Sequence, residues 1–546
     1  MRKLIACLSV ILLLIGCDNS FEEMPQGLSA NKDERRVTFR FELASRALKQ
    51  PHARGKIPFQ ATDVRFIGRD ADLNILFDVT ETKDDEFLLK IAREVTSLQV
   101  DVLSGKVVVL SNLFEIPDQE EVKFLNQPLE PRAYSGGTGI TIDPPSVQVG
   151  IEQTVEFQSF LTSGTERLAI SEFTKFSSSD TETLAFSPEH PQTARGVQTG
   201  TAIVAGDFGV PRAEMVVGVA TGSAQVRLLD TTNTQPGVLE AFLAFAPPFQ
   251  TGISVAVGDF NSDEVADLVV GTRSGTTRVR VVDGASLKLL LDIRPFGPEF
   301  QGGVRVACGD VNGDGTADVI VGAGPGGAPT VKIFDGKSGN AIEELQVFEP
   351  SFIGGVNVAS ADFNQDGRDD VVVGAGTGGP STVRVFDGAS GNLVKEFFAF
   401  EQQYVGGVRV AAGDVTGDGH ADIVASVGPS SLPEVKVFDG RSTNPIGSFF
   451  AYPAGMTSGI FVPPADLDGD GVAEIVTGTG PETPAVIKVF SGVDGDVRAE
   501  YAPLGGDFQG GVCVAGIGHK TRREVFRAQS EVTVGGGAGP EISPTP

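Results

Sequence analysis

The sequence predicts an all-β protein in which two N-terminal β-sandwich domains precede a β-propeller of four-stranded blades. A phrase such as GDVNGDGTADVIVG recurs six times in the C-terminal two-thirds of the chain, at steps of 51 or 52 residues. A fixed period of this length, with four short apolar runs in each unit, is typical of propeller blades. Upstream, short runs that alternate apolar and polar residues predict sandwich strands. The 69 Gly and 32 Pro residues suit a chain that turns often.

Each unit contains four predicted strands in a constant order. They follow the consensus GGVRVA, ADVVVG, TVRVFDG and a run that ends in Phe-x-Ala-Phe. Asp-Gly and Ser-Gly between the third and fourth strands predict a tight hairpin turn. The first strand carries small residues, as an innermost strand near a crowded axis should. The phenylalanines of the fourth strand are expected to pack between neighbouring blades.

The number of blades has two readings, and the sequence favours seven. Six units are complete over residues 199–509, and a seventh begins at 510–528. Its third strand would be 531–537 and its fourth 184–188, so that both chain ends share one blade and no free edge remains. This places the propeller at 199–537. In the alternative, GTAIVAG belongs to the preceding domain, GGVCVAG completes the first blade, and the propeller has six blades of about 52 residues.

The N-terminus predicts export. A short positive region and an apolar run too short to span a bilayer end in Leu-Ile-Gly-Cys, which resembles the bacterial lipobox. This implies a signal peptide over 1–17 and lipid attachment at Cys17, so that the chain is held at the bacterial cell membrane on its periplasmic or outer side. An ordinary secretory signal is the alternative. Residues 18–35 then read as a tether.

Two sandwich domains and a linker are expected before the repeats. Alternating runs over 36–128 predict a β-sandwich of the immunoglobulin-like kind, and the Gly- and Pro-rich segment 129–139 predicts a linker. Residues 140–198 resemble the bacterial group-2 immunoglobulin-like domain. The resemblance rests on the opening P-x-S-V-x-V-G and the central KFSSSD, although Phe176 stands where that family usually has Trp. Residues 538–546 form the predicted tail.

The net charge limits the classes of binding partner, and the cysteines raise the question of a disulfide. The net charge of −28 disfavours nucleic acid and anionic membrane surfaces, so contact with a membrane is expected through the lipid alone. Bound calcium would offset part of this charge. Cys308 and Cys513 lie in predicted strands at non-equivalent positions of their units. They are expected to be small buried thiols, with a disulfide as the alternative in an exported protein.

Acidic loops follow the first strand of the repeat units and are the strongest chemical signal. Five of them place side-chain oxygens at loop positions 1, 3, 5 and 9. Calcium prefers six to eight oxygens in a flexible cage, to which the backbone carbonyl at position 7 can add. Glycine at position 6 permits the sharp turn in four loops. The candidate ligands are Asp259, Asn261, Asp263 and Asp267; Asp310, Asn312, Asp314 and Asp318; Asp362, Asn364, Asp366 and Asp370; Asp414, Thr416, Asp418 and Asp422; and Asp466, Asp468, Asp470 and Glu474.

With these loops the chain resembles the FG-GAP and VCBS-type repeats of integrin α subunits. The resemblance implies a propeller with about five structural Ca²⁺ sites that mediates adhesion or ligand binding. Two loops depart from the pattern: Glu264 replaces the usual glycine, and the first unit, with Asp207, Gly209 and Glu214, is shortened and expected to hold no metal. The alternative is that the loops are solvated acidic turns without an ion, although clustered carboxylates would then repel one another.

Catalytic signals are weak. Gly322–Gly327 fits G-x-G-x-x-G, but a strand follows it where a dinucleotide site needs a helix. We therefore expect a lipid-anchored, exported, calcium-binding propeller that binds an unidentified protein or glycan, with no catalytic residues. The alternatives are a secreted polysaccharide-active enzyme that uses the propeller funnel, and a purely structural component of the cell envelope. The absence of Trp, a common sugar platform, disfavours the enzyme.

Overall fold

The chain is all-β, as predicted. The computed structural model describes residues 34–40, 63–82, 86–104, 107–119, 121–125, 130–135, 139–163, 166–169, 175–187, 192–209, 214–231, 237–492, 494–517 and 525–535. The predicted signal peptide (1–17), the lipid-attachment residue Cys17, nearly all of the predicted tether and the tail (538–546) lie outside these residues. Every element within them is a strand, and none is a helix of the length and hydropathy that crossing a bilayer requires.

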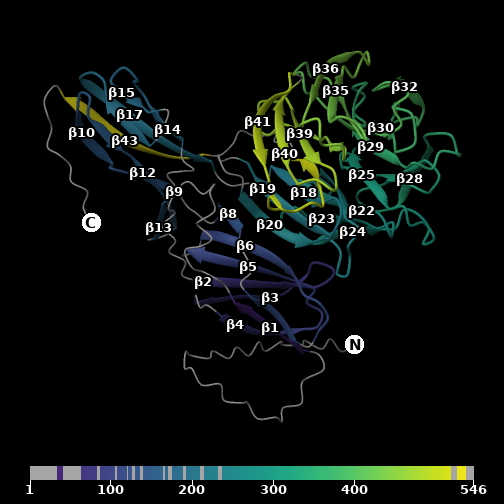
Figure 1. The fold of residues 1–546 in the computed structure, drawn as a ribbon, viewed down its shortest axis with the longest axis horizontal. Helices are drawn as coiled ribbons and strands as arrows, with labels where there is room; N and C mark the ends of the chain where they lie inside the picture. The colour runs from purple at the N-terminus through teal and green to yellow at the C-terminus, as the bar shows by residue number, and fades with distance from the viewer. Residues whose placement is uncertain are drawn as a thin grey trace, which may run out of the picture.

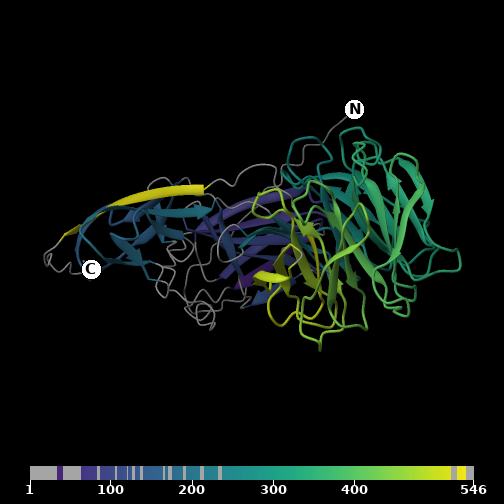
Figure 2. The same cartoon turned by 90° about the horizontal axis from the view of Figure 1, so that it is seen from above.

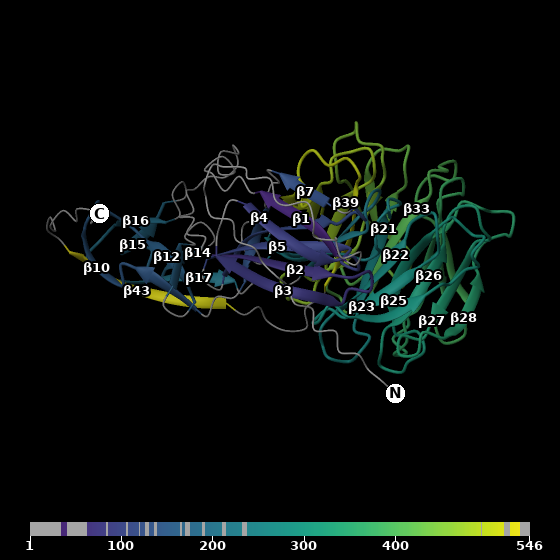
Figure 3. The ribbon, with the colours of Figure 1, turned by 90° about the horizontal axis from the view of Figure 1, so that it is seen from below.

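Three bodies make up the molecule (Figure 1). The propeller lies at one end, a second sandwich at the other, and the N-terminal sandwich lies against the propeller. The view from above shows the second sandwich and the propeller at opposite ends of the long axis (Figure 2). From below, strands of the N-terminal sandwich lie beside the first blades (Figure 3).

The N-terminal sandwich consists of two sheets, with strand orders β4-β1-β7 and β3-β2-β5-β6-β8. Alternate side chains of its strands enter a core in which Phe66, Leu98 and Val100 are fully buried. The strands are β1 (Glu34–Arg40), β2 (Asp63–Arg69), β3 (Ile75–Thr82), β4 (Glu86–Ala92), β5 (Ser97–Ser104), β6 (Val107–Glu115), β7 (Glu121–Leu125) and β8 (Glu130–Ser135).

The linker predicted at 129–139 is wrong, because β8 occupies most of it. This strand pairs with β6 and makes one parallel bridge, Arg132 to Val238, with the outer strand of the first blade. The N-terminal sheet and the first blade thereby become one nine-stranded sheet. The segment is rich in Pro and Gly, but a short strand of few ladder bonds tolerates such residues.

Side chains strengthen this junction. Arg280, from the third strand of the second blade, is 1% exposed and ion-pairs with Asp72 of the N-terminal sandwich at 2.8 Å. Its Nη1 also donates to the carbonyls of Ala71 and Ala244. Leu73 packs into the apolar cluster of the first blade. The N-terminal sandwich is therefore joined to the propeller by packing and not by a flexible connection.

The second sandwich has three small sheets, with orders β10-β43-β17-β14, β11-β16-β15 and β13-β12-β9. Its core includes Phe157, which is fully buried, and the ring of Phe176 lies 6.1 Å from that of Phe186. The strands are β9 (Gly139–Asp143), β10 (Ser146–Gly150), β11 (Thr154–Glu156), β12 (Gln158–Ser163), β13 (Glu166–Ala169), β14 (Lys175–Ser178), β15 (Leu184–Phe186), β16 (Thr193–Gly196), β17 (Gly200–Gly209) and β43 (Val525–Gly535).

The propeller is inserted into this sandwich, which the sequence did not predict. β43 returns from the C-terminal end of the chain and lies between β10 and β17, parallel to the first and antiparallel to the second. Val532 and Val534 are buried in the sandwich core. The predicted boundaries of 140–198 and 199–537 are therefore wrong: propeller strands run from Met215 to Gly516, and the sandwich takes a segment from each side of them.

Six blades form the ring in the part of the chain that the structure describes; the first is one end of the nine-stranded sheet, and the innermost strand of the last is split into β37 and β38. The first, from the innermost strand outward, is β42-β18-β19-β20, and the other five follow chain order. The strands are β18 (Met215–Val219), β19 (Gln225–Asp230), β20 (Gly237–Leu243), β21 (Ile253–Gly258), β22 (Asp267–Thr272), β23 (Val279–Val282), β24 (Leu289–Ile293), β25 (Val304–Gly309), β26 (Asp318–Ala323), β27 (Thr330–Phe334), β28 (Ala341–Gln346), β29 (Val356–Ala361), β30 (Asp370–Ala375), β31 (Thr382–Phe386), β32 (Leu393–Phe398), β33 (Val408–Gly413), β34 (Asp422–Val427), β35 (Glu434–Phe438), β36 (Pro445–Phe450), β37 (Ile460–Phe461), β38 (Pro464–Ala465), β39 (Glu474–Thr479), β40 (Ile487–Ser491), β41 (Asp496–Tyr501) and β42 (Val512–Gly516).

The prediction of seven blades is wrong, and the six-bladed alternative describes the ring. β42 pairs with β18 and contacts β21 on one side and the innermost strand β38 of the last blade on the other. Segments assigned to a seventh blade are used elsewhere: β43, which covers most of the predicted third strand, pairs with β17 in the second sandwich, and β15, at the predicted fourth strand, pairs with β16. A strand from the C-terminal end thus completes the blade that the N-terminal end begins, and this removes a free sheet edge.

Burial within the blades follows the repeat. The second strand of every blade is buried along its length, for example β26 with six buried residues. Predicted aromatic packing also occurs, since the ring of Phe397 lies 4.8 Å from that of Phe438 in the next blade.

Cys308 and Cys513 are free thiols, and the Cys308 Sγ donates to the Val257 carbonyl.

Candidate metal centres

The five acidic loops lie at one face of the propeller. Each joins the innermost strand of a blade to its second strand, and the antiparallel order of the strands brings the hairpin between the third and fourth strands to the same face. Contacts confirm this placement: Asn261 Nδ2 donates to Asp283 of the hairpin at 3.1 Å, and Asn364 Nδ2 to Asp387 at 3.0 Å. The loops are 259–266, 310–317, 362–369, 414–421 and 466–473.

The position-1 carboxylate curls each loop around itself. In the third unit, Asp310 accepts the backbone N–H groups of Gly313 and Gly315, both at 2.7 Å. Asp414 and Asp466 accept the equivalent pairs in their loops. The residues at positions 4 and 6 have positive φ in all five loops. Glycine therefore suits these positions, and the sequence-based argument for position 6 extends to position 4.

Positions 3 and 5 continue the curl. Asn312 Oδ1 accepts the N–H of Asp314 at 2.8 Å, and Asp314 Oδ1 accepts that of Thr316 at 2.9 Å. Each side chain thus spans its own next turn, and Asn312 Nδ2 donates to Asp318 at 3.1 Å. These side chains are largely solvent-exposed in all five loops, apart from Asn312, which is half-buried.

Position 9 differs, because its carboxylate is buried beneath the loop. Asp267 and Asp318 are fully buried, and Asp370, Asp422 and Glu474 are 4% exposed or less. In each loop this group accepts the N–H of position 2, for example Val311 to Asp318 at 3.1 Å. Asp318 also accepts the N–H of Gly336 in the hairpin. The position-9 group therefore fastens the loop, the second strand and the hairpin together, a role that the sequence pattern did not reveal.

Burial governs the acidity of these groups. It raises the pKa of Asp318 to about 6, against the N–H bonds that lower it. The pKa values of Asp267, Asp370, Asp422 and Glu474 are raised in the same direction, again chiefly through burial. A carboxylate with a raised pKa is one that gains from a nearby positive charge.

Carboxylates converge most closely in the sixth unit. One oxygen from each of Asp466, Asp468 and Asp470 lies within 4.8 Å of the other two. Two ligands of one calcium ion, each at about 2.4 Å, are at most ~4.8 Å apart, so this spacing fits a shared ion. Glu474 lies outside this group and ion-pairs with Arg498. In the other four loops position 3 is Asn or Thr, so fewer carboxylates are available to converge.

Basic side chains already approach three of the loops. Lys337 lies 3.2 Å from Asp314, Arg441 lies 2.5 Å from Asp418, and Arg498 lies 3.0 Å from Asp468. These pairs are exposed and contribute little to stability. They show that the exposed carboxylate oxygens attract cations. Asp263 and Asp366 have no such ion pair among the described residues.

Neighbouring loops are hydrogen-bonded to one another around the ring. The position-8 N–H of one loop donates to the position-1 carbonyl of the loop before it, as Ala317 does to Asp259, Asp369 to Asp310 and Ala473 to Asp414. Gln365 Nε2 donates to Gly419 across the remaining pair of loops. Ordering one loop therefore orders its neighbours, because a displaced position 1 breaks a bond to the next blade.

These observations fit calcium as the group that the acidic loops would hold. Side-chain oxygens alternate along a tightly curled backbone, a carboxylate triad converges in one loop, and the buried position-9 carboxylate has a raised pKa. The donor set is entirely oxygen, which calcium prefers.

The first unit has no such loop. Asp207 lies in β17, paired through the backbone with Lys175 and Arg527 in the second sandwich. Glu214 takes the buried position 9, and its carbonyl accepts the N–H of Ile517. The position-1 residue and the rest of the pattern are therefore separated into different domains.

Glu264 identifies a strained position, and its replacement should stabilise the second loop. It stands at position 6 with φ of 66°, where the other four loops have glycine. We expect Glu264→Gly to raise the melting temperature, because relief of left-handed strain is worth roughly 1 kcal/mol. Differential scanning calorimetry measures this. Glu299→Gly, at an exposed position outside the acidic loops, is the control, and a fall in melting temperature for Glu264→Gly alone would contradict the argument.

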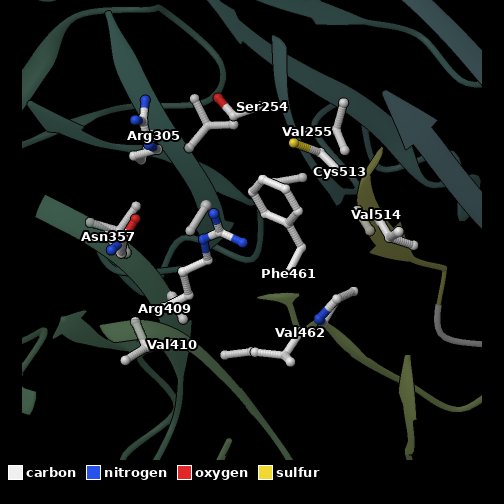
Figure 4. A pocket seen from close by; sticks show the side chains of 18 of the residues that line it. Ser254, Val255, Arg305, Asn357, Arg409, Val410, Phe461, Val462, Cys513 and Val514 are labelled. Carbon is white, nitrogen blue, oxygen red and sulfur yellow. The ribbon is translucent and has the colours of Figure 1, made fainter. Parts of the chain in front are cut away.

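The structure also assembles a set of residues that the sequence reading missed. The second position of the innermost strands, which repeats every 51 or 52 residues, lines the central channel in all six blades (Figure 4). It holds Ser254, Arg305, Asn357, Arg409, Phe461 and Cys513. The sequence could have revealed these residues, because this position varies in chemistry from unit to unit while its neighbours stay nearly constant.

Comparison with known proteins supports the repeat assignment. Residues 259–321, 310–373 and 362–425 match the FG-GAP-like repeat. Integrin alpha-5 of Xenopus laevis is 28% identical over 219 residues, which cover 35% of this chain and 21% of that protein. Integrin alpha-8 of Gallus gallus is 27% identical over 162 residues, 26% of this chain and 16% of that protein. The chain thus spans about a fifth of the length of these relatives.

Solved structures resemble the chain only weakly. The Dos1 propeller covers 71% of this chain and 98% of its own, with 12% identity and a TM-score of 0.33. U3-55K covers 54% and 83%, with 13% identity and a TM-score of 0.35. The sequence matches, together with the strand pairing, place an FG-GAP type of β-propeller in this chain.

Proposed function

We propose that this chain is an exported binding and adhesion module, anchored by lipid at Cys17, whose calcium-stabilised propeller recognises a protein or glycan partner. The observation that carries the proposal is the ring of five acidic loops, hydrogen-bonded from blade to blade along one face. Its repetition favours a structural ion at each loop over a catalytic site, which needs one copy only. The match to two integrin alpha chains favours a binding module over an enzyme.

Calcium would be held by the side chains at positions 1, 3, 5 and 9 of each loop. When bound, it supplies positive charge that neutralises carboxylates which otherwise repel one another. The loop residues supply the rest: position 1 holds the curl, and position 9 ties the loop to the second strand and the hairpin. Both are required before the exposed oxygens can face one centre.

The arrangement of the domains supports presentation of the propeller as a rigid head. The N-terminal sandwich follows the proposed anchor and shares a sheet with the first blade. Arg280 and Asp72 fix the same junction. The immunoglobulin-like character of the two sandwiches belongs to this proposal as a spacer role.

The test is calcium-dependent binding by a soluble form of the chain. Cys17→Ser should abolish lipid labelling and release the protein from the membrane fraction. That protein is then applied to a glycan array and to intact cells, in calcium and in EDTA. We expect specific binding in calcium that is lost in EDTA and in Asp466→Asn/Asp468→Asn. Asp207→Asn, in the unit without a metal loop, is the matched control.

Two results would overturn the proposal. Binding that is equal in calcium and in EDTA would separate recognition from the loops. Release of sugar fragments from an arrayed polysaccharide would assign the chain to the enzymes. Membrane retention of Cys17→Ser would remove the lipid anchor alone.

A further inference from the structure

The central channel of the propeller carries positive charge in a strongly acidic protein. Arg305 and Arg409 occupy the second position of the innermost strands β25 and β33. Arg273 directly follows β22, the second strand of the blade that precedes the blade of Arg305. All three line the same two cavities, of about 200 and 540 Å³. The close-up shows Arg409 reaching toward the middle of the channel beside Phe461 (Figure 4).

Phe461 holds two of the guanidinium groups in place. The Cζ of Arg409 lies 3.9 Å from the centre of its ring, and that of Arg273 lies 4.9 Å away. Stacking of this kind fixes the plane of a guanidinium without using its N–H groups. The donors of both arginines therefore stay available to another group in the channel.

Few of these donors are used within the protein. Arg409 Nη1 is buried and has no hydrogen-bond partner. Arg305 Nη1 donates to the carbonyls of Val304 and Arg273, and Arg273 Nη1 reaches only the Cys513 sulfur at 3.6 Å. A guanidinium offers five N–H donors, so most are left over.

No carboxylate neutralises the three charges. In the part of the chain that the structure describes, none of the three arginines forms an ion pair. Among the residues that line the two cavities there is a single acidic side chain, Glu482, and it is exposed at the mouth. By contrast, the buried guanidinium of Arg280 in the second blade is paired with Asp72.

Burial and like charge lower the pKa values of two of the three arginines, Arg305 and Arg409. Burial, and then the charge of Arg273, lowers the pKa of Arg409 to about 9. The pKa of Arg305 is lowered well below its usual value for the same two reasons. Unpaired, half-buried charges that also repel one another are retained at a cost to stability, and a bound anion would lower that cost.

The wider cavity opens on the face opposite the acidic loops. Its wall is formed by the turns between the second and third strands and by the segments that enter the innermost strands. It is lined by Thr377, Ser430, Thr457, Ser458 and Thr483, together with glycine backbone. The hydroxyls of Thr377 and Thr483 already donate to the carbonyls of Gly406 and Gly480. Small polar groups around a cationic floor suit a compact ligand that carries both charge and hydrogen-bond acceptors.

We propose that the central channel is an anion-binding site, in which Arg273, Arg305 and Arg409 bind a small ligand bearing carboxylate or phosphate groups. Arginine forks match the geometry of both groups. Phe461 acts as a positioning residue. Asn357, at the same level of the ring, donates one amide N–H to the Val408 carbonyl, which leaves its second N–H for the ligand. The site is separate from the calcium loops and goes beyond the adhesion function proposed above.

Isothermal titration of the full chain in calcium, at constant ionic strength, tests the proposal with glycerol 3-phosphate and with sodium succinate as probes, because both bind calcium only weakly. We expect millimolar or tighter binding of at least one, and the stronger of the two identifies the group. Arg409→Gln should weaken binding about tenfold or more, since a charge-assisted bond contributes roughly 1.5–3 kcal/mol. Arg384→Gln, which removes a paired arginine from the third strand of another blade, should leave it unchanged.

A second measurement guards against misfolding. Without anion, Arg409→Gln should melt at the same temperature as the wild type or higher, because it removes an unpaired, half-buried charge. With anion, the wild type should gain melting temperature and the variant should not. Absence of binding by both probes, or equal weakening in both variants, would overturn the proposal. Retention of the calcium-dependent melting shift in Arg409→Gln would show that the loops are independent of this site.

Discussion

Chelation of calcium should lower the melting temperature of the propeller by roughly 20 °C if all five loops are occupied at about 100 times their dissociation constants. Each such site contributes about 2.7 kcal/mol, or ~13 kcal/mol for five. Unfolding about 300 residues carries an entropy of roughly 0.6 kcal/mol per kelvin, which converts that free energy into the stated shift. Calorimetry in calcium and in EDTA measures it.

The loops make this shift large for a second reason. Removal of an ion leaves the carboxylates of Asp466, Asp468 and Asp470 within reach of one another, so repulsion adds to lost ligation. Hydrogen bonds such as Ala473 to Asp414 carry the disorder to the neighbouring blade. Magnesium should restore little, because it demands a tighter octahedron. An unchanged melting curve in EDTA would count against occupied sites and favour solvated acidic turns.

Two truncations should have opposite effects on the propeller. A chain that stops after Ile517 keeps β42 and lacks β43, so the first blade stays complete. The second sandwich loses the strand between β10 and β17 and the buried side chains of Val532 and Val534. Each is worth roughly 1.5–3 kcal/mol in burial, against a total of 5–15 kcal/mol for a domain. We expect the sandwich to unfold and the propeller transition to persist.

A chain that stops after Gln509 lacks β42 as well. The first blade then has no innermost strand, and β18 exposes an unpaired edge toward the channel. Because β42 contacts both neighbouring innermost strands, the ring opens and cooperative melting of the propeller should be lost. Calorimetry and limited proteolysis distinguish the two chains. If both chains lost the propeller transition equally, closure by β42 would be refuted.

Local features of the structure could be predicted from the sequence because the same residue pattern recurs in six units. The strand order within a blade, the hairpin after each third strand and the curl of each acidic loop depend on residues close together in the chain. Position 6 shows this well: glycine there was predicted from its spacing, and its φ is positive in every loop. Position 9 was only half understood, because its burial beneath the loop depends on the hairpin that covers it.

Blade number and domain boundaries were beyond the sequence pattern. GTAIVAG and GGVCVAG fit the same consensus, so the pattern alone could not decide which of them forms the innermost strand of the first blade. In the structure, β17 pairs with β43 along its length, which gives both strands a buried face in the second sandwich. β42 pairs with β18 and so becomes the innermost strand of the first blade. Pairing between segments some 300 residues apart is decided by which surfaces bury each other, and such surfaces exist only after the blades have formed.

The sequence by itself determined an all-β repeat with an acidic turn in each of five units, since period, turn residues and oxygen ligands are local properties. Tertiary structure alone decided that six blades close the ring, that the propeller interrupts a sandwich, and that Arg273, Arg305 and Arg409 meet in the channel. The physical reason is the same in each case. Ring closure brings together positions one blade apart, and the burial and charge of a residue depend on those neighbours.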